Sequence, residues 1–124
     1  MSIEEKLFKV LTTSTVINTK VSTANINPDH RNQDDSLPAI DYQRTGGHRV
    51  VHLGGYAGLE NGHYNVNIYT SDIDSRRVIG EAVIEAMSSS VEFSAQTFSS
   101  PIDDFDDELN QFIRTLEFSI WNRE

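Results

Sequence analysis

The sequence predicts a single α+β domain in which a mostly antiparallel sheet carries two helices on one face. The chain has 124 residues, of which 37% are hydrophobic, and this suits one domain with a modest core. Two segments repeat apolar residues with the period of a helix. The other apolar segments alternate with polar residues and follow one another in runs, which is typical of antiparallel strands rather than of βαβ units.

The first predicted element is a helix that begins after Ser2. Ser2 and Glu5 have the spacing of a capping box, and the apolar residues on one face are Ile3, Leu7, Val10 and Leu11. A run of threonines ends this helix, and residues 16–23 are predicted to form a short strand. Residues 24–36 are rich in Asn and Asp, which predicts a flexible loop. Residues 39–44 alternate as a half-buried strand does.

Six of the seven glycines lie between positions 46 and 62, which predicts a long hairpin with a flexible, glycine-rich tip. Neither a lysine nor a helix start follows them as in a phosphate-binding loop. With so few side chains to form contacts, we expect this segment to be poorly ordered in the free subunit and to become ordered on assembly. The candidate assembly residues are Gly46, Gly47, Arg49, His52, Gly54, Gly55, Gly58 and Gly62.

The second half of the chain predicts a strand, a helix and two further strands. Residues 64–69 alternate cleanly as a strand. Asp72 or Asp74 then caps a helix that ends at three serines. Strands are predicted at 91–98 and 111–121. The expected core on the helix-facing side of the sheet consists of Val66, Ile68, Val78, Ile79, Ala82, Val83, Ala86, Phe93, Leu116 and Phe118.

An acidic connector is predicted between the last two strands, at residues 101–108. Its apolar residues Ile102, Phe105 and Leu109 have the spacing of one helical turn anchored on the core. The acidic residues lack the glycine and the distal glutamate of a calcium loop. The sequence therefore predicts a solvated acidic turn formed by Asp103, Asp104, Asp106, Asp107 and Glu108.

Charge is distributed unevenly along the chain, whose net charge is −9. Residues 1–60 contain seven acidic and six basic residues, whereas residues 61–124 contain twelve acidic and four basic residues, a net charge of −8. The longest basic cluster is Arg76-Arg77. Because tight binding to DNA requires basic residues that replace condensed counterions, we do not expect this chain to grip the phosphate backbone.

Several kinds of chemistry are not expected from the sequence. The chain has no cysteine, which excludes disulfides and thiolate zinc sites. His48 and His52 share a strand face but lie about 13 Å apart at the usual rise, too far for one metal ion. No nucleophile motif is present, so neither catalysis nor a cofactor is expected. No apolar run is long enough to span a membrane, and the first residues do not resemble a leader, so we expect a protein assembled in the cytoplasm.

From Leu37 onward the order of features resembles a known family. The segment Leu37-Pro38-Ala39-Ile40-Asp41-Tyr42-Gln43-Arg44 is similar to one found in phage tail-completion proteins, the tail terminators of long-tailed phages. In that family a glycine-rich hairpin, an alternating strand, a helix and a closing strand follow. Here they correspond to residues 46–62, 64–69, 74–87 and 111–121, although Val66-Asn67-Ile68-Tyr69 departs from the usual residues of the middle strand.

The resemblance implies a structural role in the virion, at the junction of head and tail. Members of the family form a ring, commonly a hexamer, that ends the tail tube and contacts the head–neck connector, while DNA passes through the lumen without specific binding. No cofactor, catalytic activity or membrane is implied. In such a ring, we expect the acidic turn at residues 103–108 to face the lumen or a partner rather than a neighbour's like charges.

Two other classes of function stay open at this point. One is a small enzyme or ligand-binding domain that uses the loops at residues 46–62. The other is an adaptor that binds a peptide by adding it as a strand to a sheet edge. A ring observed by native mass spectrometry favours assembly over both.

Overall fold

The computed structural model describes residues 2–29, 37–52, 55–97 and 99–123; for residues 48–52, 55–59 and 123 it describes the backbone alone. Helices and strands alternate in runs along the chain. The elements are α1 (Ile3–Thr13), α2 (Thr15–Lys20), η1 (Thr23–Asn25), β1 (Ile26–Pro28), β2 (Ala39–His52), β3 (Gly55–Thr70), α3 (Ile73–Ser88), β4 (Ser94–Thr97), β5 (Ile102–Asp106) and β6 (Gln111–Arg123).

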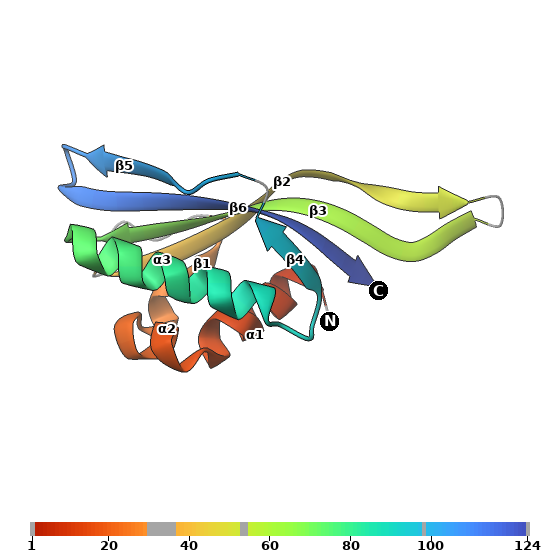
Figure 1. The fold of residues 1–124 in the computed structure, drawn as a ribbon, viewed down its shortest axis with the longest axis horizontal. Coiled ribbons are helices and arrows are strands. Elements are labelled where there is room, and N and C mark those ends of the chain that lie inside the picture. The colour runs from red at the N-terminus through yellow and green to blue at the C-terminus, as the bar shows by residue number, and fades with distance from the viewer. Residues whose placement is uncertain (1, 30–36, 53–54, 98, 124) are drawn as a thin grey trace.

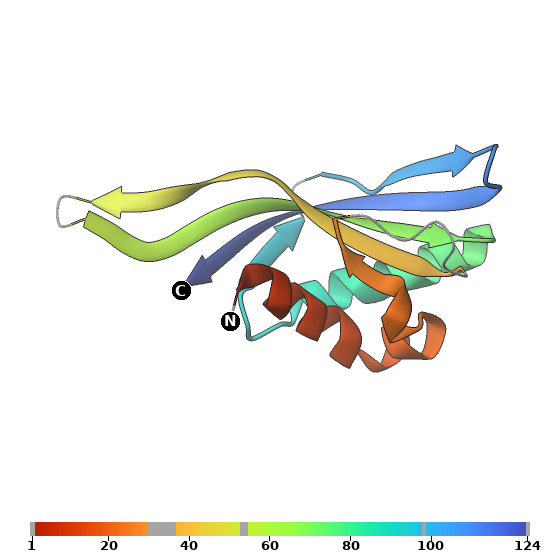
Figure 2. The same cartoon turned by 180° about the vertical axis from the view of Figure 1, so that it is seen from behind.

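One sheet organises the fold, with the strand order β1-β2-β3-β6-β4. β4 pairs with residues 118–121 of β6, and β5 pairs with residues 111–115 of the same strand. β1 is parallel to β2, and every other pairing is antiparallel. The helices all lie on one side of the sheet, and the β2–β3 hairpin extends well beyond them (Figures 1 and 2). The predicted α+β class is therefore confirmed, with three α-helices instead of two.

The N-terminal helix forms as its residues predict. Ser2 Oγ accepts a hydrogen bond from the backbone N–H of Glu5 at 3.2 Å, which caps α1. Its buried residues are Leu7, Val10 and Leu11. The strand predicted at residues 16–23 is wrong, because Ser14 caps a second helix, α2. In α2 the hydroxyl of Thr19 donates to the carbonyl oxygen of Thr15 at 2.7 Å, so this β-branched side chain is accommodated in a helix.

The polar segment after α2 contains regular structure where a loop is predicted. Residues 24–28 include the end of η1 and the strand β1, which pairs with β2 from Ile26↔Ile40 to Pro28↔Tyr42. Ile26 is buried in this pairing. The rest of the predicted loop, residues 30–36, lies outside the described residues.

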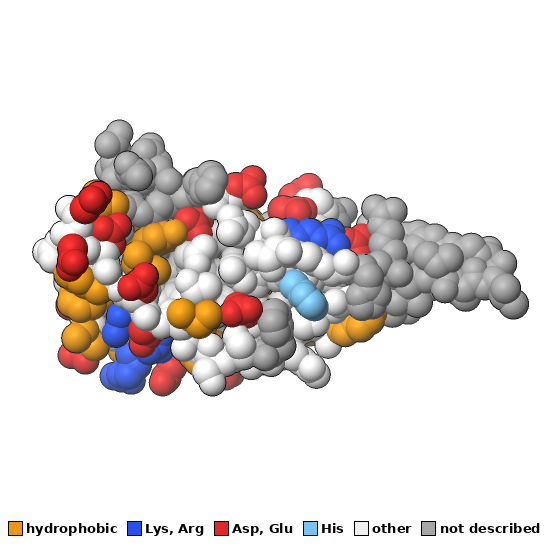
Figure 3. Space-filling model, turned by 90° about the horizontal axis from the view of Figure 1, so that it is seen from above, with side chains coloured by type: hydrophobic (Ala, Val, Ile, Leu, Met, Phe, Trp, Pro, Cys, Tyr) orange, Lys and Arg blue, Asp and Glu red, His pale blue; other side chains and the backbone are white. Residues whose placement is uncertain are grey.

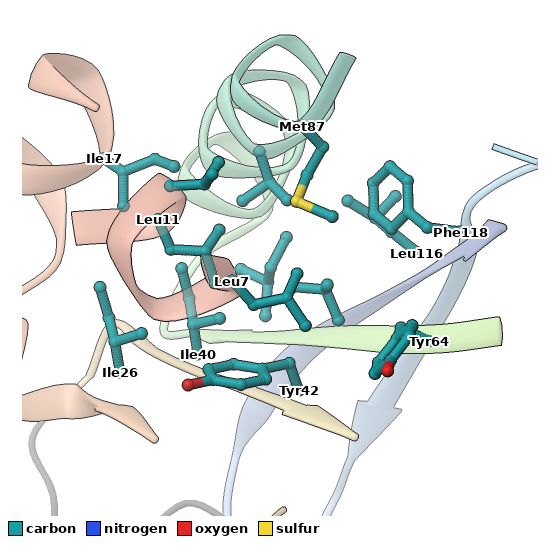
Figure 4. Packing of buried hydrophobic residues seen from close by; sticks show 14 of the residues in the cluster. Leu7, Leu11, Ile17, Ile26, Ile40, Tyr42, Tyr64, Met87, Leu116 and Phe118 are labelled. Carbon is teal, nitrogen blue, oxygen red and sulfur yellow. The ribbon is translucent and has the colours of Figure 1, made fainter. Parts of the chain in front are cut away.

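The core lies between the helices and the face of the sheet that we call the covered face. Alternate residues of β2, β3 and β6 point into it, and α1 and α3 close it from the other side (Figure 4). Of the ten predicted core residues, Val78 is half-buried outside the cluster, Ala82 and Ala86 pack against it, and the others are buried within it. The cluster also contains Leu7 and Leu11 of the predicted N-terminal stripe, together with Ile17, Ile26, Ile40, Tyr42, Tyr64, Met87 and Ile120.

The helix α3 is capped by Asp72, the first of the two residues predicted as its cap. Asp72 Oδ1 accepts a hydrogen bond from the backbone N–H of Ser75 at 2.7 Å, and this bond lowers the pKa of the Asp72 carboxyl. Burial along α3 is confined to one stripe that includes Ile79, Val83 and Met87. This stripe is what the helical period predicts.

The other face of the sheet, the open face, carries no helix and is mostly polar (Figure 3). On it, Asp41, Asn67 and Thr115 form a ladder across β2, β3 and β6. Asn67 Nδ2 donates to Asp41 Oδ1 at 2.7 Å, and Thr115 Oγ1 donates to Asn67 Oδ1 at 2.8 Å. The hydroxyl of Tyr69 donates to the other oxygen of Asp41 at 2.9 Å. Asp41 is only 3% exposed, so this carboxylate is held by hydrogen bonds across neighbouring strands.

The last third of the chain corrects two predictions. Residues 91–93 form a bend, with Val91 96% exposed, and β4 begins only at Ser94; Phe98 lies outside the described residues. The acidic connector is a strand, β5, rather than a helical turn. Its backbone pairs with β6 from Ile102↔Thr115 to Asp106↔Gln111, and this pairing overrides the helical spacing of the apolar residues.

Candidate assembly surfaces

The glycine-rich segment is the distal half of the β2–β3 hairpin, and we call it the arm (residues 46–62). Its two strands stay paired from Gly46↔His63 to His52↔Gly55. β6 follows β3 only as far as Leu59↔Arg123, so the outermost part of the arm is two-stranded. The arm projects beyond the helices and the core (Figure 1).

At two glycines of the arm, the surrounding atoms leave no room for a side chain. Gly47 has a φ of +131°, and a Cβ there would lie 2.1 Å from the carbonyl oxygen of Asn61. A Cβ on Gly62 would lie 2.4 Å from Cε2 of the buried Tyr64 ring. By contrast, a Cβ on Gly46 would meet only His63 Nδ1, at 4.0 Å.

The other candidate assembly residues are placed by their backbone alone. Arg49 and His52 lie on β2, and Gly55 and Gly58 lie on β3. Gly54 is outside the described residues. The structure thus brings the candidates together on one hairpin.

The edge of β2 that faces away from β3 is covered only at its start. β1 pairs with it up to Tyr42, and the backbone N–H of Asp29 donates to the Tyr42 carbonyl oxygen at 2.7 Å. Beyond this point, among the described residues, no strand pairs with the side of residues 43–52 that faces away from β3, and we call this side the β2 edge. The register shifts between Arg44 and Gly46 and again between Arg49 and Val51.

Charge and shape distinguish the start of the β2 edge. Arg44 Nη1 forms an ion pair with Glu60 Oε1 on β3, and its Nε donates to the Gly46 carbonyl oxygen at 3.1 Å. Beside this edge, α1, β1 and β2 border an open hollow of about 580 Å³. Its surface is mostly apolar, with Phe8, Pro28 and Tyr42, and Glu4, Glu5, Lys9 and Thr12 of α1 also line it. Phe8 is 37% exposed there. This hollow joins residues that are distant in sequence, which is why the sequence did not reveal it.

The opposite edge of the sheet is acidic, and its first acid is neutralised within the chain. Arg114 binds Asp103 through two hydrogen bonds, Nε to Oδ1 at 2.7 Å and Nη2 to Oδ2 at 3.1 Å. This pairing lowers the pKa of the Asp103 carboxyl. Arg76 of α3 adds a contact to Asp103 Oδ2 at 3.5 Å and donates to the Asp104 carbonyl oxygen at 3.2 Å.

The remaining acidic residues are oriented outward or hold the turn. Asp106 Oδ1 accepts hydrogen bonds from the backbone N–H groups of Glu108 and Leu109 at 3.0 and 3.2 Å, and this closes the turn into β6. Asp104, Asp107 and Glu108 are exposed. The predicted acidic turn is therefore an edge strand with its following turn, residues 102–110, which we call the β5 edge.

The β5 edge is also the place where large apolar side chains reach the surface. Ile102, Phe105 and Leu109 are 52%, 39% and 45% exposed, so they do not anchor the segment on the core as predicted. The Phe105 ring packs on Phe112, with the centroids 4.8 Å apart, and the Arg76 guanidinium lies 5.6 Å from the Phe112 ring centroid. Apolar side chains gather at this end of the molecule, opposite the arm (Figure 3).

Within the described part of the chain, no three His, Asp or Glu side chains gather as a metal site would require. The described helices also include none that is long and apolar enough to cross a membrane.

The fold class defined by these elements is an α+β domain with one helix-covered sheet and a projecting two-stranded arm. No model of a known protein family matches the sequence, and no curated protein matches it either. Among solved structures, the fold is similar to a chain of the virion of a native gene transfer agent particle. The TM-score is 0.74 at 11% sequence identity, and the match covers 99% of this chain and 96% of that one. The two chains therefore share one fold over nearly their whole length.

Proposed function

We propose that this protein is a structural component of a phage-like virion. The observation that carries the proposal is the shared fold, which extends over nearly the whole of this chain and of a chain from a gene transfer agent virion. A match over both full lengths supports an equivalent subunit rather than a common submotif inside unrelated proteins. In this proposal the protein belongs to an assembled particle, and its partners are other virion proteins.

Within that class, we propose that it is a tail terminator, a non-enzymatic subunit of a ring at the junction of tail and head. The ring, commonly a hexamer in the family, ends the tail tube and contacts the head–neck connector. The segment Leu37–Arg44, which resembles the terminators, leads directly into the β2 edge. The arm then supplies a subunit with a means of reaching past its own core to a neighbour.

The charge of the chain agrees with a lumen through which DNA passes. A net charge of −9 per subunit is multiplied by the number of subunits in the ring, and a negative lumen repels the phosphate backbone rather than retaining it. In this proposal the arm is the assembly element, and the acidic residues of the β5 edge form a surface offered to a partner.

Native mass spectrometry and negative-stain electron microscopy of the purified protein test the ring. We expect a closed oligomer with a central opening, present alone or after addition of tail tubes. Deletion of the gene in a particle-producing strain should give tails without attached heads. A protein that stays monomeric, even with tail tubes, and whose deletion leaves particles normal would contradict the proposal.

A further inference from the structure

We propose that the β2 edge of one subunit pairs with the β5 edge of a second copy of this chain, so that neighbouring sheets join edge to edge. This inference rests on the proposed ring, and it names the two surfaces that build it. The β2 edge and the β5 edge lie at opposite ends of the strand order. Contacts between two different surfaces of identical subunits are heterologous, and they close into rings when the rotation permits.

Strand direction is the first argument. Each step from β2 to β3, to β6 and to β5 is antiparallel, so β5 runs opposite to β2. A neighbouring copy in the same orientation, shifted along the strands towards the arm, therefore presents its β5 antiparallel to the β2 edge. The shift is required because Ile102 and Asp104 lie level with Asp41 and Ala39 across β6 and β3, at the part of β2 that β1 already covers. Antiparallel pairing is the more stable arrangement per residue, and it satisfies the free backbone groups of both edges.

Charge is the second argument. Residues 43–52 contain two arginines, two histidines and no acidic residue, whereas residues 102–108 contain five acidic residues and no basic one. Asp103 is already neutralised by Arg114, and Arg44 by Glu60. The exposed acids of the β5 edge are Asp104, Asp107 and Glu108, and the sequence of the β2 edge contains a second arginine, Arg49. Opposite charges on two edges favour their pairing over pairing of like edges.

The apolar groups are the third argument. In an antiparallel pairing, the C-terminal end of β5 points towards Tyr42, where the β2 edge begins. The hollow lined by Phe8, Pro28 and Tyr42 lies there, on the covered side of the sheet. Phe105 lies on the same side, because its partner Phe112 faces Arg76 of α3. The half-exposed Phe105 of one copy is thus directed to the hollow of the next.

This pairing revises the position expected from sequence for the acidic residues. Like-charge repulsion argued against a subunit contact when the segment was taken as an isolated turn. In the fold it is an edge strand whose proposed counterpart, residues 43–52 of the next subunit, contains two arginines and no acidic residue. One cost is local: the Asp104 carboxylate accepts from the Phe105 N–H at 2.8 Å, and a docking strand must exchange that bond.

Engineered cysteines test the pairing, because the natural chain has none. Gly46→Cys is combined in one chain with Asp104→Cys, both on the open face. In a pairing that begins beyond Tyr42, Asp106 lies beside Gln43 and, across the register shift between Arg44 and Gly46, Asp104 lies beside Gly46. Within one subunit β3 and β6 separate these positions, about 14 Å at the usual strand spacing. A disulfide needs Cα atoms within about 7 Å, so it can form only between two copies. We expect mild oxidation to give a ladder of covalent oligomers that ends at the ring size.

Matched controls make the result specific. The single variants should give no ladder, and Gly46→Cys combined with Ser89→Cys, exposed at the end of α3, should give none either. As a second measurement, Phe105→Ser should weaken oligomerisation at least tenfold, whereas Val91→Ser at an exposed site away from both edges should not.

The outcomes separate the pairing from the ring itself. Closed rings without the ladder overturn the pairing and leave the proposed function standing. Disulfide dimers formed as readily by Gly46→Cys alone overturn it in favour of a symmetric β2–β2 contact. A cross-link from β2 to a different virion protein overturns it as well, and would mean that this edge accepts a partner's strand. If neither rings nor cross-links form with tail tubes present, both proposals fail.

Discussion

The covered and open faces of the sheet are built from the same three strands but are stabilised by different interactions. On the covered face, Tyr42, Val66 and Leu116 lie in register on β2, β3 and β6 and are almost completely buried under the helices. One residue away along each strand, Asp41, Asn67 and Thr115 form a hydrogen-bonded polar ladder on the open face. Alternation along a strand thus separates an apolar interior from a polar exterior.

This difference shows where stability resides and where assembly surfaces can develop. Burial of apolar side chains supplies the main driving force for folding, and the cluster of large buried apolar side chains lies on the covered face. The edges and the arm contribute little to that core, so they are free to carry charge, glycine and exposed aromatic side chains. The following changes test the contrast, from the largest expected effect to the smallest.

Val83→Asp should break the covered face most severely. Val83 is fully buried on α3, and an aspartate there would place an unpaired charge in the core at a cost of several kcal/mol, enough to unfold a marginal domain. Circular dichroism with thermal melting measures the loss. Glu81→Asp, at an exposed position on the same helix, is the control and should melt close to the parent. A Val83→Asp variant that melts like the parent would mean that the register of α3 is wrong.

Gly62→Ala should destabilise the covered face at the base of the arm, where Gly62 packs on the buried Tyr64 ring. Its Cβ would lie 2.4 Å from the buried Tyr64 ring, and relief of this overlap should cost about 1–3 kcal/mol. Gly46→Ala is the matched control, since its Cβ would contact only His63 Nδ1 at 4.0 Å. Chemical denaturation of both variants measures the difference. Equal stabilities would contradict the close packing of Gly62 against Tyr64.

Asn67→Ala should weaken the open face by a smaller amount. It removes the hydrogen bonds to Asp41 and Thr115. One oxygen of the Asp41 carboxylate, which is only 3% exposed, then loses its hydrogen-bond donor. The expected cost is about 1–2 kcal/mol in the free energy of unfolding. Asn65→Ala, half-buried on the same strand and face, is the comparison and should cost less. The reverse order would show that the ladder is not a stabilising unit.

Asp103→Asn at the β5 edge should have the smallest effect, with a defined pH dependence. The pKa of Asp103 is lowered in the folded state by its hydrogen bonds with Arg114, so its contribution is present above the unfolded pKa of about 3.9 and is lost as the pH falls through the folded value. Because the pair is partly exposed, the cost at neutral pH should stay below about 1 kcal/mol.

Urea denaturation at several pH values checks this prediction. The stability difference between the parent and Asp103→Asn should shrink as the pH falls below about 4 and disappear in stronger acid. Asp107→Asn, exposed in the same turn, should give a smaller difference throughout. A difference that grows in acid would have the wrong sign for a carboxyl stabilised by Arg114.

Local sequence signals predicted the elements that are built from regular patterns. The Ser2 and Asp72 caps, the helical stripes of α1 and α3, and the alternation of β3 and β6 are each properties of neighbouring residues. Where the sequence-based prediction was wrong, a tertiary contact prevailed. α2 forms because Ile17 is buried against the core, and β5 forms because β6 offers it a partner.

The sequence by itself determined the class of the fold, the core and the glycine-rich hairpin. Apolar periodicity determines which side chains can be buried together, and the glycines mark the hairpin. Only the tertiary structure decided the strand order, and with it the two edges left for pairing. It also decided that Asp103 meets Arg114 and that Phe8 and Tyr42 share one hollow. These contacts join residues far apart along the chain, and no local pattern specifies which distant segments become neighbours.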